Sequence, residues 1–155
     1  MMKTKMVVFD MDGTLNRFYD VEGWLDMLRA EDPTPYAVAE PMWEMEKLAE
    51  TLMAVKNVGI EIRVVTWLSK DATEEYKNLV RQAKLEWLEE MNFPFDKFHA
   101  VQYGATKANS VRKYLAEDET AILFDDNEKV RKGWTLGETV DPTTTNIIEF
   151  LENLL

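Results

Sequence analysis

Three short, mostly apolar runs stand out along the chain, at residues 6–9 (MVVF), 62–66 (IRVVT) and 121–124 (AILF). Continuous rather than alternating apolarity is typical of parallel strands that are covered on both faces. A weaker run at residues 97–102 (KFHAVQ) is a fourth candidate strand. The pattern therefore predicts an interior, mostly parallel sheet.

Helical periodicity fills the intervals between these runs. At residues 42–55 and 76–91, apolar side chains recur every three or four positions, which predicts two helices that cover the sheet. Shorter helices are expected at 108–115 and 147–154, the latter entered through Pro142 and capped by a threonine of the tract 143–145. Strands that alternate with helices imply right-handed crossovers. We expect an α/β fold, a doubly wound sheet with helices on both faces, in one domain over residues 1–155.

Polar residues follow the predicted strands at the points where ligands bind in such sheets, outside the carboxyl ends of the strands. Asp10 and Asp12 follow the first strand, and Thr66 ends the second. Lys107 opens the helix after the third strand, and Asp125 and Asp126 follow the fourth. Four clustered carboxylates repel one another unless a cation holds them. Ligands that are all oxygen suit Mg²⁺ rather than zinc, so all four aspartates are candidate metal ligands.

The order of these features resembles the haloacid dehalogenase superfamily of phosphohydrolases. The resemblance consists of a strand followed by D-x-D-G-T, a strand that ends in threonine, a lysine, and a strand that ends in D-D. It spans roughly residues 4–134, and the string FDMDGTLN at residues 9–16 is its most specific part. The resemblance implies a Mg²⁺-dependent phosphomonoester hydrolase that acts through a covalent aspartyl phosphate.

By this resemblance, Asp10 is the nucleophile, and Asp12 is the acid that protonates the leaving oxygen and then the base for the attacking water. Elementary chemistry agrees, because one intervening residue in an extended segment places both carboxylates on the same side. Gly13 allows the chain to turn tightly beside the phosphate with its backbone amides exposed.

The resemblance also implies that Thr66 and Lys107 hold the phosphoryl oxygens and that Asp125 holds Mg²⁺, helped by Asp126 directly or through a water. Attack of a carboxylate on a phosphate ester joins two anions, so a metal ion and an ammonium group are needed to cancel their repulsion. Two alternatives stay open: Ser69 is a nearby substitute for Thr66, and Lys70 competes with Lys107.

Residues 16–40 lie where many members of the superfamily carry a cap domain. The segment is too short for a full cap, so we expect a minimal lid or a capless site. The strings HAVQYGATK at 99–107 and FDDN at 124–127 resemble the nucleotidase-like branch, and Trp67 could stack on a base. The expected partner is a small phosphorylated substrate, with a nucleotide as one candidate.

Two rival functions remain. A receiver-like signalling module also combines acids, a threonine, a lysine and Mg²⁺ on a similar sheet, but its adjacent acid pair comes first, whereas here D-x-D comes first and D-D last. A phosphotransferase or phosphomutase would pass the phosphoryl group to an alcohol instead of water.

Composition narrows the partners. The net charge is −11 and the isoelectric point about 4.6, a balance that repels nucleic-acid duplexes and anionic membrane surfaces. The chain has no cysteine, which excludes disulfides and thiolate chemistry. No apolar run has the length of a membrane span or signal peptide, so we expect a soluble cytoplasmic protein.

Overall fold

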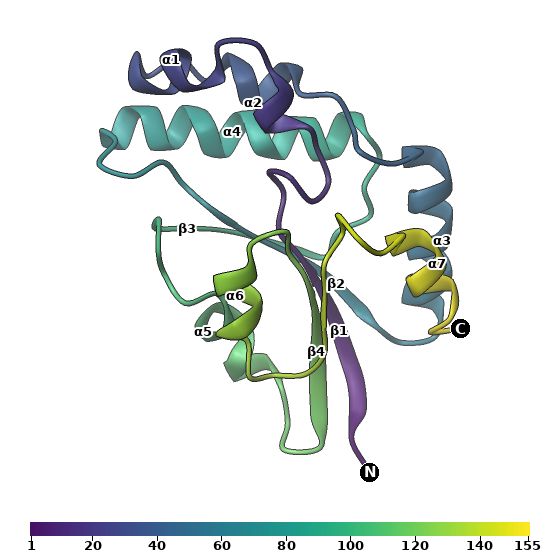
Figure 1. The fold of residues 1–155 in the computed structure, drawn as a ribbon. Coiled ribbons are helices and arrows are strands. Elements are labelled where there is room, and N and C mark those ends of the chain that lie inside the picture. The colour runs from purple at the N-terminus through teal and green to yellow at the C-terminus, as the bar shows by residue number, and fades with distance from the viewer.

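The computed structural model describes residues 1–155, and its centre is a five-stranded sheet in the order β3-β2-β1-β4-β5 in which every neighbouring pair is parallel (Figure 1). The strands are β1 (Lys3–Phe9), β2 (Glu61–Trp67), β3 (Lys97–Val101), β4 (Glu119–Phe124) and β5 (Thr139–Val140). The α-helices are α1 (Trp24–Arg29), α2 (Thr34–Val38), α3 (Met45–Asn57), α4 (Glu74–Glu90), α5 (Lys107–Val111), α6 (Glu128–Lys132) and α7 (Ile147–Glu152). Two 3₁₀ turns are η1 (Phe18–Asp20) and η2 (Arg112–Tyr114).

The predicted α/β fold class is confirmed. The four apolar runs form β1 to β4, and the two long periodic segments form α3 and α4. The sequence analysis missed β5, which has two residues, and the helices α1, α2 and α6, which have five or six, so that all are too short to show a period. The helix expected at residues 108–115 is also shorter than predicted, because α5 gives way to the 3₁₀ turn η2.

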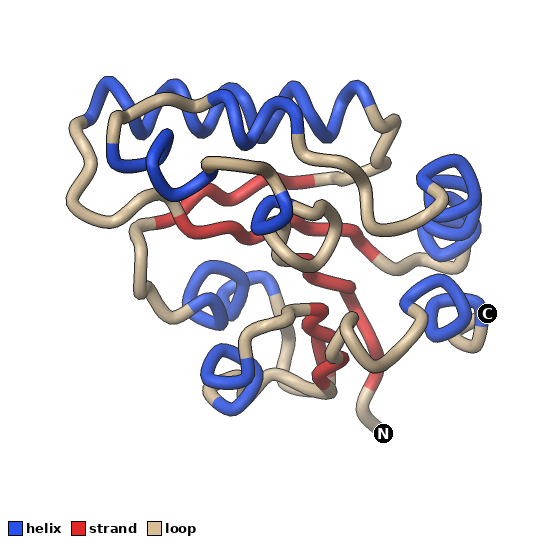
Figure 2. Tube along the Cα trace, turned by 45° about the horizontal axis from the view of Figure 1, so that its top comes forward, coloured by secondary structure: helices blue, strands red, loops and turns tan.

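Helices cover both faces of the sheet (Figure 2). Alternate residues of a strand point to opposite faces, so in β1 Val7 and Phe9 join one apolar cluster while Met6 and Val8 join another. The first cluster packs against α3, α7 and the end of α4, and the second packs against α5 and α6. Burial on both faces explains why the strands read as continuous apolar runs. No helix combines the length and the apolarity that a membrane crossing requires.

Residues 16–40 connect β1 to α3 through η1, α1 and α2, and this segment lies along α4 (Figure 1). Phe18 and Tyr36 form a third apolar cluster with Tyr76 and Val80 of α4. At one end, Thr73 donates its backbone N–H to the Glu31 carboxylate at 3.0 Å. The segment is therefore attached to the sheet layer mainly through one helix.

The start of α7 corrects one expectation. Its N-cap is Asn146, not a threonine: the Asn146 side chain accepts the backbone N–H groups of Ile148 at 3.0 Å and Glu149 at 3.2 Å. The hydroxyls of Thr143 and Thr144 bond to Asp141 instead. Asparagine sits at the last non-helical position, where its short amide reaches the free N–H groups of the first turn.

This cap predicts a specific effect on stability. Asn146→Ala should lower the free energy of unfolding by about 1 kcal/mol, because two N–H groups lose their acceptor. In a chain of this size the melting temperature should fall by about 2–4 °C. Thr145→Ala is the matched control and should leave the melting temperature unchanged. A larger loss from the threonine variant in thermal melts would restore the original assignment.

Candidate active site

The site lies at the topological switch point of the sheet, between β1 and β4. From β1 the chain adds β2 and β3 on one side, and then returns to add β4 and β5 on the other. Phe9 pairs with Phe124 at the carboxyl ends of β1 and β4, and the Asp10 backbone N–H donates to the Phe124 carbonyl at 3.0 Å. Crevices at such switch points are the usual ligand sites of open α/β sheets.

Three carboxylates meet at this point. Asp10, Asp125 and Asp126 each offer an oxygen, and these oxygens lie within 4.8 Å of one another. Burial, followed by the charge of Asp10, raises the pKa of Asp125 to about 6 and that of Asp126 to about 7. The ion-free cluster is thus short of positive charge, and its hard oxygen ligands suit Mg²⁺.

Lys107 links the nucleophile candidate to the metal-ligand candidates. Its buried ammonium donates to Asp10 Oδ1 at 2.9 Å and to Asp125 Oδ2 at 2.8 Å. Burial alone would lower the pKa of Lys107, but the two carboxylates raise it, so the ammonium stays charged. Lys107 opens α5, as the sequence predicts.

Asp12, which the sequence analysis included among the metal ligands, lies outside the group of three. Its Oδ2 accepts from the Lys84 ammonium at 3.1 Å, and its Oδ1 accepts from Asn16 Nδ2 at 3.3 Å. The same ammonium donates to Thr66 Oγ1 at 2.6 Å. Two lysines therefore bond to the aspartates of the site, and of these two the sequence analysis found only Lys107.

The loop that follows β1 interlocks with the loop that follows β4. Thr14 is fully buried; its hydroxyl lies 3.2 Å from Asp10 Oδ2 and 3.3 Å from Asp126 Oδ1, and it accepts the Asp126 backbone N–H at 3.1 Å. Gly13 has a φ of +82°, and a Cβ atom there would overlap the Asp126 carboxylate. Glycine is thus required both for the turn and for the close approach of Asp126.

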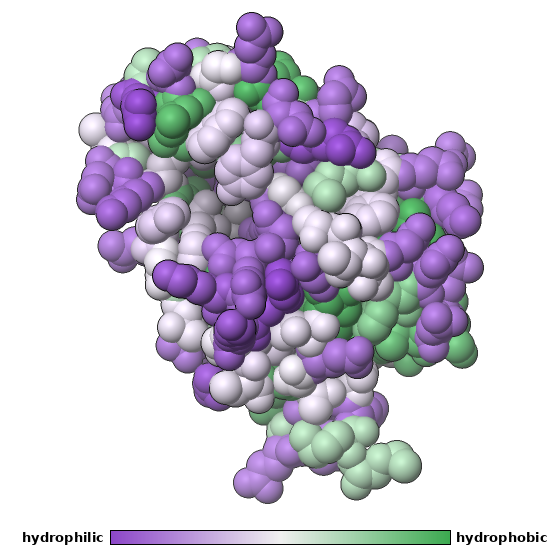
Figure 3. Space-filling view, in the orientation of Figure 1, coloured by the Kyte–Doolittle hydropathy of each residue, from purple (hydrophilic) through white to green (hydrophobic).

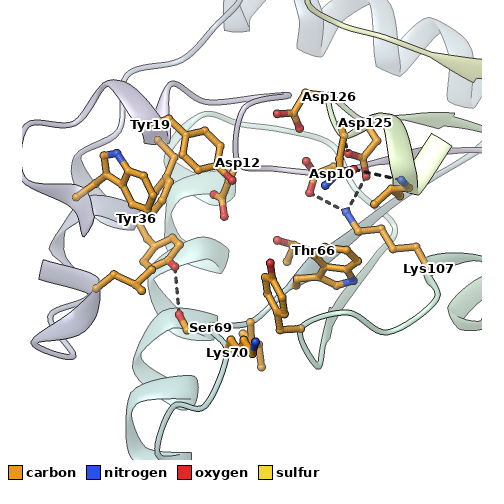
Figure 4. Close-up of a pocket in the computed structure, with 18 residues that line it drawn as sticks. Asp10, Asp12, Tyr19, Tyr36, Thr66, Ser69, Lys70, Lys107, Asp125 and Asp126 are labelled. Atoms are coloured by element: carbon orange, nitrogen blue, oxygen red, sulfur yellow. Dashed lines mark hydrogen bonds and ion pairs between the residues drawn. The ribbon is translucent and has the colours of Figure 1, made fainter. Parts of the chain in front are cut away.

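A cavity of about 400 Å³ opens in front of these groups. The space-filling view shows the surface hollowed beside a cluster of hydrophilic side chains near the centre of the molecule (Figure 3). In the close-up, Asp10, Asp125 and Asp126 lie with Lys107 toward one side of the cavity, Asp12 lies nearer Tyr19, and Ser69 and Lys70 lie toward another side (Figure 4).

The two alternatives from the sequence also line this cavity. Ser69 Oγ lies 3.2 Å from the Tyr36 hydroxyl, and Lys70 is exposed. Neither contacts the aspartates, whereas Lys107 bonds to two of them and Thr66 is joined to Asp12 through Lys84. The geometry therefore favours Thr66 and Lys107 over their substitutes.

Aromatic side chains form much of the cavity wall. Trp67 and Tyr103 form one pair with ring centroids 5.1 Å apart, and Tyr19 and Trp24 of the 16–40 segment form another with ring centroids 5.2 Å apart. The Trp67 ring is fixed by its N–H, which donates to the Ala105 carbonyl at 2.9 Å. Burial and the nearby carboxylates raise the pKa of Tyr19, so its hydroxyl remains protonated.

Comparison with known proteins supports the fold. No family model matches the chain, and no curated protein matches it. Among solved structures, the chain is similar to a D,D-heptose 1,7-bisphosphate phosphatase from Burkholderia thailandensis, with a TM-score of 0.50 and 16% sequence identity. The match covers 87% of this chain and 75% of that one. At this identity the likeness establishes the Rossmann-like α/β fold alone, which agrees with the haloacid dehalogenase-like order of the motifs.

The raised pKa values of Asp125 and Asp126 predict how pH acts on the protein without metal. Protonated forms of these carboxyls are favoured by folding, so their contribution to stability is full below about pH 4 and is lost as the pH rises through 6 to 7. Mg²⁺ competes with these protons and should stabilise the protein more at pH 8 than at pH 5.5. At about 100 times its Kd the ion should add about 2.7 kcal/mol at pH 8.

Thermal melts with Mg²⁺ and with a chelator, at both pH values, measure this difference. Using the difference between the two melts at each pH removes contributions from groups outside the site. Asp126→Asn should reduce the effect of Mg²⁺ at pH 8. An equal effect at both pH values, or none at pH 8, would rule out a metal site at these carboxylates.

Proposed function

We propose that this protein is a Mg²⁺-dependent phosphomonoester hydrolase of the haloacid dehalogenase type, acting through a covalent phosphate on Asp10. The observation that carries the proposal is the Lys107 ammonium, which joins the Asp10 and Asp125 carboxylates inside the switch-point crevice. The proposed nucleophile and a proposed metal ligand thus share hydrogen bonds with the same positive charge, which supports the proposal. A phosphatase among proteins of similar fold adds support.

The carboxylate group fits Mg²⁺. Asp10, Asp125 and Asp126 would hold the ion, because their oxygens are close together and Lys107 is the positive charge that bonds to them. When bound, Mg²⁺ supplies positive charge that offsets the negative charge of the phosphoryl oxygens. Asp12 would not hold the ion, because it lies outside the group of three carboxylates and is bonded instead to Lys84 and Asn16.

The chain's own residues account for both steps of hydrolysis. In the first, an Asp10 oxygen attacks phosphorus, the bond from phosphorus to the leaving oxygen breaks, and Asp12 transfers its proton to that oxygen. In the second, Asp12 accepts a proton from water as the water attacks phosphorus, which releases inorganic phosphate and frees Asp10. Lys107 and Thr66 face the transferred group and donate to its oxygens. If an alcohol replaced water in the second step, the same residues would perform phosphotransfer.

The proposed substrate is a small phosphate ester, and the cavity wall favours a nucleotide. Residues 16–40 act as a minimal lid whose aromatic side chains line the cavity together with Trp67 and Tyr103. Planar bases stack well on such rings, whereas sugar phosphates gain little from them.

The division of labour between the first two aspartates can be tested by labelling. Asp10→Asn should form no phosphoenzyme and should turn over at background rate, because the nucleophile is gone. Asp12→Asn should lose about 100- to 10,000-fold with an alkyl phosphate and less with an aryl phosphate, whose leaving group needs little protonation. Labelled phosphate should accumulate on Asp10 in this second variant, because water lacks its base.

Single-turnover reactions with acid quenching and peptide mapping would locate the label. Label on another residue, or wild-type turnover by Asp10→Asn, would reject the covalent mechanism.

The nucleotide assignment makes its own prediction. Trp67→Ala should raise KM for nucleoside monophosphates by about 5- to 150-fold, the equivalent of 1–3 kcal/mol of stacking, and should leave glycerol phosphate unaffected. Trp67→Phe loses the hydrogen bond to Ala105 but keeps an aromatic ring. Because the ring can still stack on a base, this variant should retain most of the nucleotide affinity. Equal losses for both substrate classes in steady-state assays would argue against base stacking.

A further inference from the structure

Lys84 is an unusual residue for its position. It lies in the middle of α4 on the buried face, one helical turn from both Val80 and Leu88, and its residue is 0% exposed. Lysine is rarely fully buried, because removing its charge from water is costly unless the ammonium is fully paired. Here the three ammonium hydrogens match three acceptors: Asp12 Oδ2 at 3.1 Å, Thr66 Oγ1 at 2.6 Å and the Trp67 carbonyl at 2.9 Å.

We propose that Lys84 is a positioning residue of the site, which orients the Asp12 carboxylate and fixes the Thr66 hydroxyl as a hydrogen-bond donor toward the cavity. Its effect on catalysis rests on the proposed phosphatase function. Lys84 itself is covered, while Asp12 and Thr66 line the cavity in front of it. The lysine therefore acts through these two residues and not on the substrate.

The chemistry of the ammonium group decides the direction of the Thr66 bond. An ammonium has only donors, so Thr66 Oγ1 must accept from Lys84. The single hydroxyl hydrogen of Thr66 is then left to point away from Lys84. Because Thr66 borders the cavity, this hydrogen is available to an acceptor there, such as a phosphoryl oxygen. Without Lys84, the direction of this hydroxyl hydrogen would no longer be fixed.

Asp12 is held in a comparable way. Lys84 bonds to one of its oxygens and Asn16 to the other, from two segments far apart in the chain. A carboxylate fixed on both oxygens has little rotational freedom, which preserves the alignment that proton transfer requires. The two lysines thus serve different steps: Lys107 contacts the nucleophile and Asp125, and Lys84 contacts the proton donor.

The test is the substrate dependence of Lys84→Met, a variant that keeps the length and apolar stem of the side chain. Its kcat/KM for an alkyl phosphate should fall about 10- to 100-fold more than its kcat/KM for p-nitrophenyl phosphate, because misalignment of Asp12 matters most when the leaving oxygen needs a proton. Lys107→Met, in contrast, should lower both values by similar factors. In an Asp12→Asn background, Lys84→Met should not change the ratio further, since the residue it positions is already lost.

Controls separate positioning from stability. Lys56→Met removes another partly buried ion pair, with Asp96 at 3.0 Å, and should leave the ratio of the two kcat/KM values at the wild-type level. If Lys84→Met does not fold, Lys84→Gln, which keeps a neutral donor, is measured in the same way. Equal losses with both substrates in a folded Lys84 variant would overturn the positioning role while leaving the phosphatase function intact. A wild-type protein that hydrolyses neither substrate nor any nucleotide would instead overturn the proposed function, and the catalytic role of Lys84 with it.

Discussion

The structure depends on one electrostatic constraint: four aspartates share the carboxyl edge of the sheet and need positive charge close by. The fold supplies part of it through two buried lysines from different crossovers, with Lys107 on α5 paired to Asp10 and Lys84 on α4 paired to Asp12. The two lysines do not neutralise all four aspartates, as the raised pKa of Asp126 indicates. A cluster left short of charge in this way destabilises the empty protein and favours binding of a cation, so the same repulsion that weakens the fold prepares the site.

Parallel pairing makes this arrangement possible. Because β1 and β4 are neighbours with the same direction, the residues that follow them emerge side by side although about 115 positions separate them along the chain. The helices on both faces bury most of β1, β2 and β4, and the cavity opens at the carboxyl edge of these strands. The 16–40 segment forms part of the cavity wall. It packs on α4, the helix that also carries Lys84. The wall of the cavity and the orientation of Asp12 are therefore linked through one helix.

Much of this arrangement could be predicted from the sequence because it follows from strand ends. Apolar runs located β1, β2 and β4, and the parallel direction expected of these strands predicted that Asp10 lies close to Asp125. Lys84 could not be found in this way, because a lysine within a charged helix reads as a solvated side chain. The available signal was its phase, which places it on the apolar face with Val80 and Leu88. The cap at Asn146 was missed because it depends on the position of one side chain, which hydrophobic periodicity does not reveal. Strand β5 was missed because two residues are too few to form a pattern.

The contact between Gly13 and Asp126 has a consequence for how the protein assembles. A side chain at position 13 would overlap Asp126, so the loops after β1 and β4 leave no space between them at this point. They come into contact where β4 pairs with β1. A nascent or partly folded chain that has formed β1, β2 and β3 holds Asp10 without Asp125 and Asp126, and so lacks the three-carboxylate group altogether. Pairing of β4 with β1 closes a long loop, and non-local contacts of this kind in general form more slowly than local ones. The group of three carboxylates is therefore completed only when the two halves of the sheet join.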